Sequence, residues 1–224
     1  PTKLKGVCMH PDQGSLGSEA WYRAIERQVE ILKEMGCNAI RVTHNPAAPE
    51  LIEIANEKGI MLIDEAFDTW VMPKNGNVND YSAWFEKTIG SDNAILGGDP
   101  DMTWAEFDIK AMVNQDKNSP AVIMYSLGNE IFEGTSYSRN QDYPLLASKL
   151  CTWVQEIDST RKLTFGDNKL KSATDDATPI AKQVAAVIAN NGGIVGYNYS
   201  TIGDLDSGTA NDWLVYHSET ASAV

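Results

Sequence analysis

The chain alternates short apolar runs with longer amphipathic segments along its whole length, and this alternation limits the folds it can adopt. The apolar runs are continuous, as in strands that are buried on both faces of a sheet. Apolar residues at helical spacing follow them, for example Trp21, Ile25 and Val29 in the predicted helix over 18–35. The predicted strands are 4–10, 38–44, 60–65, 122–127, 163–166, 194–199 and 213–219. Repeated strand–helix units of this kind require a parallel sheet that is covered by helices.

Polar side chains stand at the carboxyl ends of all these predicted strands. They are His10, His44, Glu65, Glu130, Asp167, Tyr199 and Glu219. In a barrel these ends converge on one face, where barrel enzymes place their active sites, whereas an open sheet gathers ligands at a single crevice. We therefore expect an α/β fold, a (β/α)8 TIM barrel that is truncated after its seventh strand. The eighth strand would then follow Val224.

The composition narrows the possible partners. The formal net charge is −13, so the chain offers few cations for phosphate backbones or anionic lipid surfaces, and we expect neither nucleic acid nor membrane as a partner. The three cysteines lack the C-x-x-C spacing of a thiolate metal site, and their odd number argues against a disulfide framework. We expect residues 1–224 to form a single catalytic barrel domain, excised from a larger multidomain parent, whose compartment stays open.

One connection departs from the strand–helix rhythm. Residues 71–102 are rich in Gly, Asn, Asp and Pro, and so long a loop in a small domain is usually functional. A helix is predicted to resume at Thr103, which forms a capping-box pattern with Glu106. Between the last two predicted strands the segment is short and rich in Gly and Asp, so a helix there is doubtful.

Two carboxylates are candidates for acid–base chemistry. Glu130 stands at a strand tip behind Asn129, where burial would raise the pKa of its carboxyl and the amide could bind a substrate hydroxyl. Strand alternation places Glu219 on the face of His217 and Val215. Alternatively, Asn129 and Glu130 only cap the next helix, and Glu219 is a boundary residue that faces solvent. Across a barrel mouth, a separation of about 5–5.5 Å would suit double displacement at a glycosidic bond with net retention.

Five motifs at the strand ends carry a family resemblance. They are Gly6-Val7-x-x-His10, Arg41-Val42-Thr43-His44-Asn45-Pro46, Asp64-Glu65-Ala66-Phe67-Asp68-Thr69-Trp70, Ser126-Leu127-Gly128-Asn129-Glu130 and Ser218-Glu219-Thr220. In this order they resemble the catalytic barrel of glycoside hydrolase family 2, most of all its β-galactosidases. The resemblance extends from the first strand to the seventh, and it is more specific for the family than for the sugar.

This resemblance implies roles for the strand-end residues. Glu130 would be the general acid/base and Glu219 the nucleophile of a retaining exo-β-glycosidase that removes terminal β-galactosides. His10 and His44 would line the galactosyl pocket, and Arg41 would orient Glu219 by charge-assisted hydrogen bonds. Tyr199 would correspond to the family's strand-six tyrosine near the nucleophile, with Tyr197 as the alternative.

Without the family, the same side chains could have purely structural roles. A strand-end histidine is often structural, Tyr197 and Tyr199 could belong to the core, and Arg41 could pair with Asp64 inside the barrel. Asp68 is a candidate acceptor for sugar hydroxyls, and Trp70 is either a platform that stacks on the sugar or a packing residue under the long loop. Asp167 is a weaker candidate for a substrate contact.

The resemblance also has departures and further implications. Some β-galactosidases of the family hold a divalent cation with a Glu and a His just after the third strand, but Thr69-Trp70-Val71 offers no such pair, so we predict no magnesium there and no cofactor. The family implies neighbouring β-sandwich domains, and unpaired barrel edges could recruit a second copy of the chain.

Several functions remain open at this point. β-Glucuronidase and β-mannosidase are the alternatives within the family. A metal-dependent barrel hydrolase would use His10, Asp12, His44 and Asp167 as ligands, although no H-x-H pair follows the first strand. A carbohydrate-binding module is the non-enzymatic alternative, but it would have no use for two opposed acids.

Overall fold

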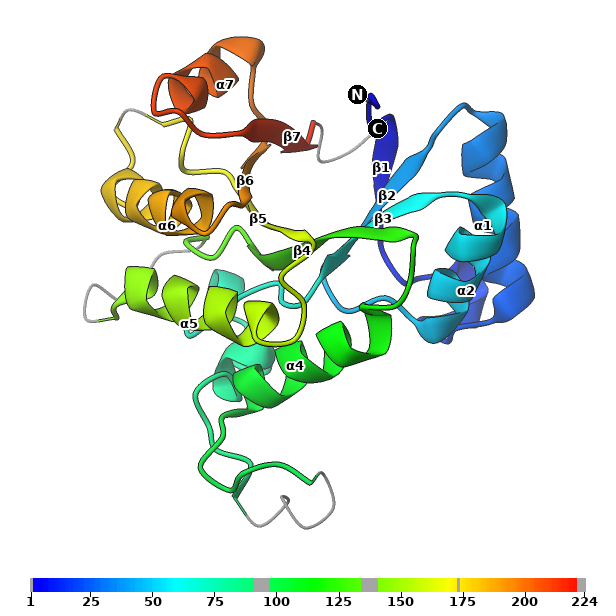
Figure 1. The fold of residues 1–224 in the computed structure, drawn as a ribbon, viewed down its shortest axis with the longest axis horizontal. Helices are drawn as coiled ribbons and strands as arrows, with labels where there is room; N and C mark the ends of the chain where they lie inside the picture. The colour runs from blue at the N-terminus through cyan, green and yellow to red at the C-terminus, as the bar shows by residue number, and fades with distance from the viewer. Residues whose placement is uncertain (1, 91–96, 134–140, 173, 221–224) are drawn as a thin grey trace.

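Seven parallel strands form one sheet in the computed structural model, which describes residues 2–90, 97–133, 141–172 and 174–220 (Figure 1). Neighbouring strands are consecutive in the chain, in the order β1 to β7. The strands are β1 Gly6–Met9, β2 Ala39–Val42, β3 Met61–Glu65, β4 Val122–Asn129, β5 Lys162–Asp167, β6 Ile194–Asn198 and β7 Val215–Glu219. This order of parallel neighbours is that of a β/α barrel.

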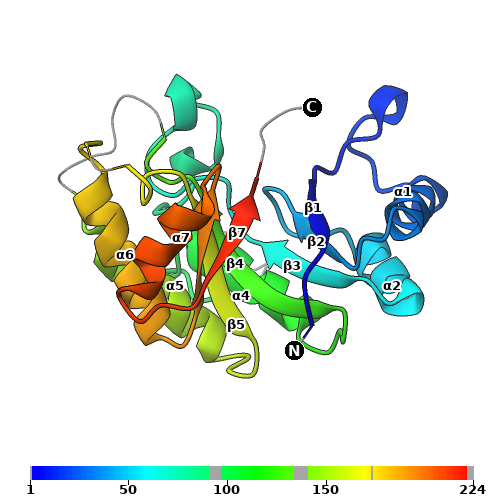
Figure 2. The ribbon, with the colours of Figure 1, turned by 90° about the horizontal axis from the view of Figure 1, so that it is seen from above.

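The sheet curls into a nearly closed barrel. Viewed from above, β1 and β7 are the two edge strands and face each other across the side that is not closed by strand pairing (Figure 2). One contact between them is a weak hydrogen bond, in which the Cys8 thiol donates to the carbonyl oxygen of Ser218 at 3.4 Å. The predicted barrel fold is therefore confirmed.

The helices lie on the outer face of the sheet (Figure 1). They are α1 Tyr22–Glu34, α2 Pro49–Lys58, α4 Trp104–Asp116, α5 Tyr143–Gln155, α6 Thr178–Asn190 and α7 Ile202–Thr209. Short 3₁₀ turns at Gly14–Leu16, Lys74–Gly76 and Tyr81–Ala83 punctuate the loops. No helix among the described residues is long and apolar enough to cross a bilayer.

Local chemistry explains several helix ends. Pro49 begins α2, where its missing N–H costs nothing, and Gly59 ends it at φ 71°, a left-handed conformation that favours glycine. The Thr103 hydroxyl caps α4 by accepting from the Glu106 N–H, which is one half of the predicted capping box. The expectation for the first helix was too long, because α1 begins at Tyr22 and leaves Trp21 54% exposed.

The segment before β7 forms a helix, although its Gly and Asp content made one doubtful. A capping box begins α7, with the Thr201 hydroxyl accepting from the Asp204 N–H and the Asp204 carboxylate accepting from the Thr201 N–H. Two backbone donors that a helix start leaves unpaired are satisfied in this way. The Thr-x-x-Asp spacing was therefore a better guide here than the glycine content.

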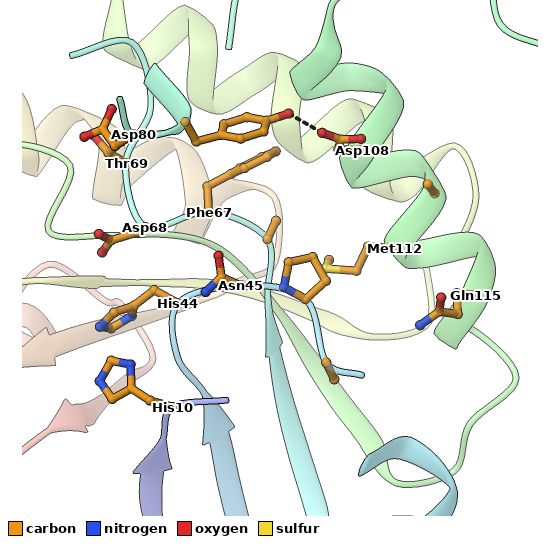
Figure 3. A pocket seen from close by; sticks show the side chains of 15 residues that line it. His10, His44, Asn45, Phe67, Asp68, Thr69, Asp80, Asp108, Met112 and Gln115 are labelled. Carbon is orange, nitrogen blue, oxygen red and sulfur yellow. Dashed lines mark hydrogen bonds between the residues drawn. The ribbon is translucent and has the colours of Figure 1, made fainter. Parts of the chain in front are cut away.

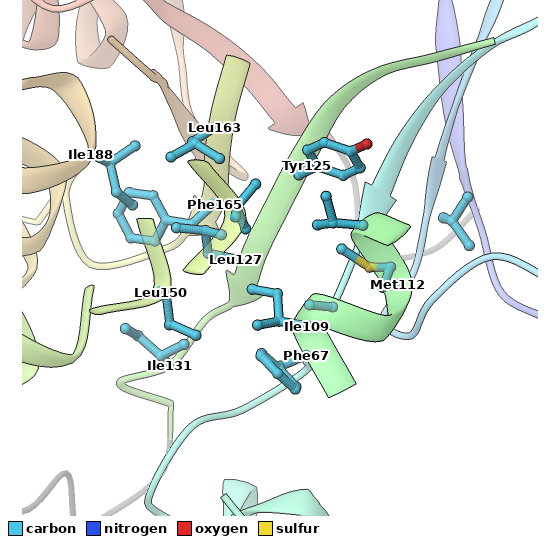
Figure 4. Packing of buried hydrophobic residues seen from close by; sticks show 14 of the residues in the cluster. Phe67, Ile109, Met112, Tyr125, Leu127, Ile131, Leu150, Leu163, Phe165 and Ile188 are labelled. Carbon is cyan, nitrogen blue, oxygen red and sulfur yellow. The ribbon is translucent and has the colours of Figure 1, made fainter. Parts of the chain in front are cut away.

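The hydrophobic core lies between the sheet and the helices. Leu127, Leu163 and Phe165 on β4 and β5 point toward Leu150 of α5 and Ile188 of α6 (Figure 4). All five are at most 1% exposed. Because apolar contacts fill the outer face of the strands, the inner face is left for polar groups, and these build the site.

Candidate active site

A buried arginine joins several strands at the carboxyl end of the barrel. Arg41 on β2 is 3% exposed, and its Nη1 lies 2.6 Å from Oε1 of Glu219 on β7. Its Nη2 lies 2.6 Å from Oε2 of Glu65 on β3 and donates at 3.0 Å to Oδ1 of Asn129 on β4. Burial opposes the charge of Arg41, but the neighbouring carboxylates raise the pKa of its guanidinium. Arg41 thus orients Glu219 through a charge-assisted contact.

The expected pairing of Arg41 with Asp64 is wrong. Successive residues of a strand point to opposite faces, so Asp64 faces the helices when Glu65 faces the barrel interior. Asp64 instead accepts a hydrogen bond from the Ala47 N–H at 2.8 Å. Glu65, and not Asp64, is therefore the carboxylate of β3 that pairs with Arg41.

Gly166 on β5 provides the space for this arginine. A Cβ atom at Gly166 would lie 2.6 Å from Arg41 Nη2 and 2.8 Å from Asn198 Oδ1. We expect Gly166→Ala to lower the free energy of unfolding by roughly 1–3 kcal/mol, because the extra methyl overpacks a buried polar cluster.

Thermal denaturation of the purified variant measures this effect. Gly203→Ala is the matched control, since the nearest atom to its added Cβ, Thr201 Oγ1, is 3.7 Å away. That exposed change in α7 should leave the melting temperature unchanged or raise it. Equal melting temperatures for the Gly166 variant and the wild type would contradict the packing argument.

Glu219 faces the interior because of a bulge in β7. The pairing of β6 with β7 shifts register between Tyr197↔His217 and Asn198↔Glu219, which places one extra residue on β7. His217 bonds to Ser200 on the outer side, at 2.9 Å, whereas Glu219 contacts Arg41 inside. The prediction that Glu219 shares a face with His217 and Val215 is therefore wrong.

Glu130 lies just beyond β4 in a left-handed backbone conformation, with φ 46°. Its N–H donates to the Gly166 carbonyl at 2.7 Å, and its Oε1 accepts from Asn198 Nδ2 at 2.9 Å. Burial raises the pKa of the Glu130 carboxyl, and the Glu219 carboxylate raises it further, while Asn198 and Lys74 oppose the rise. A carboxyl that keeps its proton to higher pH is suited to protonate a leaving group.

Asn198 is a site residue that was not among the sequence-based candidates. Its Nδ2 donates to Glu130 and, at 3.0 Å, to Asn129 Oδ1, and its Oδ1 accepts from the Ser218 hydroxyl at 2.6 Å. It thereby connects the strand ends that carry the two catalytic candidates. Its position between Tyr197 and Tyr199 at a strand end was the available signal, but the tyrosines have the more distinctive chemistry.

Glu65 also belongs to this cluster, although the sequence marked it only as a strand-end residue. Its Oε1 lies 2.6 Å from His44 Nδ1, and its Oε2 accepts from the Ser126 hydroxyl at 2.5 Å. Burial alone would raise the pKa of the Glu65 carboxyl, but Arg41, His44 and Ser126 together lower it. Glu65 is completely buried, so it holds Arg41 and His44 in place and cannot itself contact a sugar.

The structure distinguishes the two tyrosines that follow the sixth strand. Tyr197 is 2% exposed and belongs to the core. Tyr199 has φ 52°, and its N–H donates to the Glu219 carbonyl at 2.8 Å. Burial raises the pKa of the Tyr199 hydroxyl, and a hydrogen bond to Glu219 and the charge of Glu130 add to the rise. Tyr199 is therefore the tyrosine placed beside both catalytic candidates.

His10 and His44 lie at one side of the barrel mouth. Their rings meet edge to face with centroids 5.2 Å apart, and both line a cavity of about 690 Å³ that runs toward α4 (Figure 3). Beyond its bond to Glu65, His44 lies 3.3 Å from Asn129 Nδ2 and 3.8 Å from Glu219 Oε1. His10 is exposed at the end of β1.

Asp68 also lines this cavity and forms an ion pair with Lys74. Its Oδ1 lies 2.5 Å from Lys74 Nζ and accepts from Asn129 Nδ2 at 3.2 Å. The Asp68 side chain is partly exposed, so one face of the carboxylate remains available to a hydroxyl group. Lys74 belongs to no motif, and its sequence context is too generic to assign it a role.

Two predicted substrate contacts are buried instead. Trp70 has no exposed surface, donates from Nε1 to the Leu127 carbonyl at 2.8 Å and stacks on Tyr143. Trp70 is therefore a packing residue and not the sugar platform that was the other expectation. No face of its ring is free to stack on a sugar. Asp167 is likewise fully buried, and its Oδ1 accepts from the N–H groups of Lys169 and Leu170. It shapes the turn after β5 and does not reach the mouth.

The residues after β3 do not fit a divalent cation. The Thr69 hydroxyl donates to the Met72 carbonyl at 2.7 Å, Trp70 is buried, and an ammonium group already pairs with Asp68. Across the ranges that the structure covers, no three His, Cys, Asp or Glu side chains gather as a metal site. The ligand set suggested for a metal-dependent hydrolase, His10, Asp12, His44 and Asp167, is therefore not assembled.

Comparison with known proteins identifies the family. Residues 1–203 match Glycosyl hydrolases family 2, TIM barrel domain, so this chain belongs to that family, as the motifs indicated. Beta-galactosidase BoGH2A of Bacteroides ovatus is 35% identical in an alignment of 198 positions that covers 76% of this chain and 21% of that protein. A putative beta-glucuronidase of Formosa agariphila is 28% identical over 190 residues, 84% of this chain and 16% of that protein.

The solved structures agree with the fold. A glycosyl hydrolase family 2 member from Bacteroides cellulosilyticus superposes with a TM-score of 0.74 at 32% identity, covering 96% of this chain and 24% of the other. The chain thus spans about a fifth of the length of the curated relatives it matches.

Proposed function

We propose that this barrel is the catalytic domain of a retaining exo-β-glycosidase that acts on terminal β-galactosides. The observation that carries the proposal is the pairing of Glu219 with Arg41 beside a buried Glu130. Burial raises the pKa of Glu130 and the charge of Glu219 adds to the rise, and both carboxylates act on Tyr199. Two acids with different environments in one site are the arrangement that divides nucleophile from general acid.

These positions support a double-displacement reaction. A Glu219 oxygen attacks the anomeric carbon, and the bond to the leaving-group oxygen breaks as that oxygen takes the Glu130 proton. The Glu130 carboxylate then removes a proton from water, which attacks the same carbon and releases Glu219. Arg41 holds the Glu219 carboxylate throughout, while Asn129, His44 and Asp68 offer hydrogen bonds to sugar hydroxyls.

The choice of galactose rests on the names of the relatives. The 35% identical relative is named a beta-galactosidase, whereas the putative beta-glucuronidase is 28% identical. β-Glucuronidase is the second candidate function, because a relative of lower identity carries that name. The same two carboxylates would cleave a β-galactoside or a β-glucuronide. The two candidate functions therefore differ in which sugar the site binds and not in the reaction.

A substrate screen tests the proposal. The intact enzyme that carries this barrel is assayed with p-nitrophenyl β-galactoside, β-glucuronide and β-mannoside, and NMR follows the anomer released first. We expect the highest kcat/KM for the galactoside and a β-configured first product, because two displacements at one carbon restore its configuration. A preference for either other sugar would overturn the galactoside assignment. An α-configured first product would overturn the retaining mechanism.

A further inference from the structure

A lysine from the long loop after β3 reaches into the barrel mouth. The backbone N–H of Lys74 donates to Asp80 Oδ2 at 2.7 Å, which ties down the base of the residue. Its Nζ lies 2.5 Å from Asp68 Oδ1 and donates at 2.9 Å to the carbonyl oxygen of Asn129. The side chain is 14% exposed. A lysine held at both ends and mostly buried is not a mobile surface charge.

The contact with Asn129 places this charge next to the candidate acid. The Asn129 carbonyl belongs to the peptide that leads into Glu130, so an ammonium bonded to that oxygen holds the turn from which Glu130 projects. Asn129 is also tied to Asp68 through its side chain, at 3.2 Å. Asp68, Lys74 and Asn129 thus all contact one another, beside the peptide bond that joins Asn129 to Glu130.

The carboxylates at the barrel mouth carry an excess of negative charge, which the ammonium group of Lys74 offsets. Glu65 and Glu219 share the guanidinium of Arg41, which leaves the Asp68 and Glu130 carboxylates without an arginine among the described residues. Lys74 pairs with Asp68, and its charge also acts on Glu130. A buried carboxylate is costly unless a cation lies nearby.

We propose that Lys74 is a positioning residue for this reaction: its ammonium, held by Asp68 and the Asn129 carbonyl, fixes the turn that carries Glu130 and stabilises the anion that Glu130 becomes when it gives up its proton. This inference rests on the proposed function, because it needs Glu130 to act as the acid and then as the base. It also accounts for the residues after β3, which suit an internal cation and not a divalent metal.

The proposal predicts a shift in the pH profile. Burial raises the pKa of Glu130 and the Lys74 charge opposes this rise, so removal of that charge allows the carboxyl to stay protonated to higher pH. The alkaline limb of kcat/KM reports the pKa of the acid in the free enzyme. We expect Lys74→Met to move this limb upward by about 1 pH unit, the size of effect that a nearby opposite charge has on a carboxyl.

The experiment compares four variants of the intact enzyme on one aryl β-galactoside. Lys74→Met removes the charge, and Lys74→Gln removes it while keeping an amide donor for Asp68 and Asn129. Lys74→Arg restores a cation and should return the limb to its wild-type position. Lys87→Met is the matched control, because Lys87 lies over the Trp84 ring in the same loop, 4.1 Å from its centroid.

The outcomes separate the inference from the proposed function. A lower kcat with an unmoved alkaline limb in both neutral Lys74 variants would show a merely structural role and overturn the inference. A limb that moves equally in Lys87→Met would overturn it as well. A Glu130→Gln enzyme that keeps the wild-type alkaline limb would instead refute Glu130 as the acid, and with it the proposed mechanism.

Discussion

Replacing Glu219 with glutamine is expected to lower kcat by about 10⁴-fold or more on every substrate, since the amide cannot form the glycosyl-enzyme bond. Glutamine has the shape of glutamate, and Arg41 can still donate to the amide oxygen, so the barrel should fold normally. The loss should be the same for good and poor leaving groups, because both need the same attacking oxygen. Steady-state kinetics on aryl glycosides of different leaving-group pKa measure this.

The matched control for this change is Glu133→Gln. Glu133 is a carboxylate three residues beyond Glu130 that accepts from Asn168 Nδ2 and has no hydrogen bond to Arg41 among the described residues. Its charge adds to the raised pKa of Glu130, so its replacement should lower that pKa slightly and reduce kcat far less than the Glu219 change does. A fluorinated galactosyl inactivator should label Glu219 in the wild type, and mass spectrometry of the peptides would locate the label. Labelling of any other side chain would refute the nucleophile assignment.

Replacing Glu130 with glutamine is expected to act selectively. For alkyl or unactivated aryl galactosides the rate should fall by about 10²–10⁴-fold, the usual contribution of a positioned general acid. For a dinitrophenyl galactoside the first step should be nearly unaffected, since that leaving group departs without a proton. A plot of rate against leaving-group pKa should therefore be steeper for the variant than for the wild type.

A second measurement on the Glu130 variant tests its role as a base. Added azide needs no deprotonation, so it should restore turnover and give a β-galactosyl azide. The Glu219→Gln enzyme lacks the covalent intermediate and should not respond in this way. Equal losses on good and poor leaving groups, or a failure of azide to act, would remove Glu130 from the acid/base role.

Much of the fold could be predicted from the chain alone. The apolar runs predicted all seven strands, and the bounds of α2 followed from Pro49 and Gly59. The strand-end motifs predicted both the barrel and the family, because a parallel barrel brings its carboxyl ends to one face. Short-range signals of this kind depend on neighbouring residues and can be read from spacing.

The partners of individual side chains could not be predicted in the same way. Asp64 and Glu65 are adjacent acids at the end of β3, and only the pleat decided that Glu65 meets Arg41. The bulge in β7 inverted the alternation before Glu219. Trp70 has the chemistry of a sugar platform, yet its ring is packed against Tyr143 from a distant helix.

The sequence by itself determined the barrel and its family and indicated the two candidate acids, since strand periodicity and motif order are properties of contiguous residues. The tertiary structure decided which polar groups meet, because Arg41, Asn129, Asn198 and Glu219 come from four strands that the chain separates by up to 178 positions. It also placed Lys74 at the root of Glu130, as a buried cation is stable only where folding brings anions and carbonyl oxygens around it.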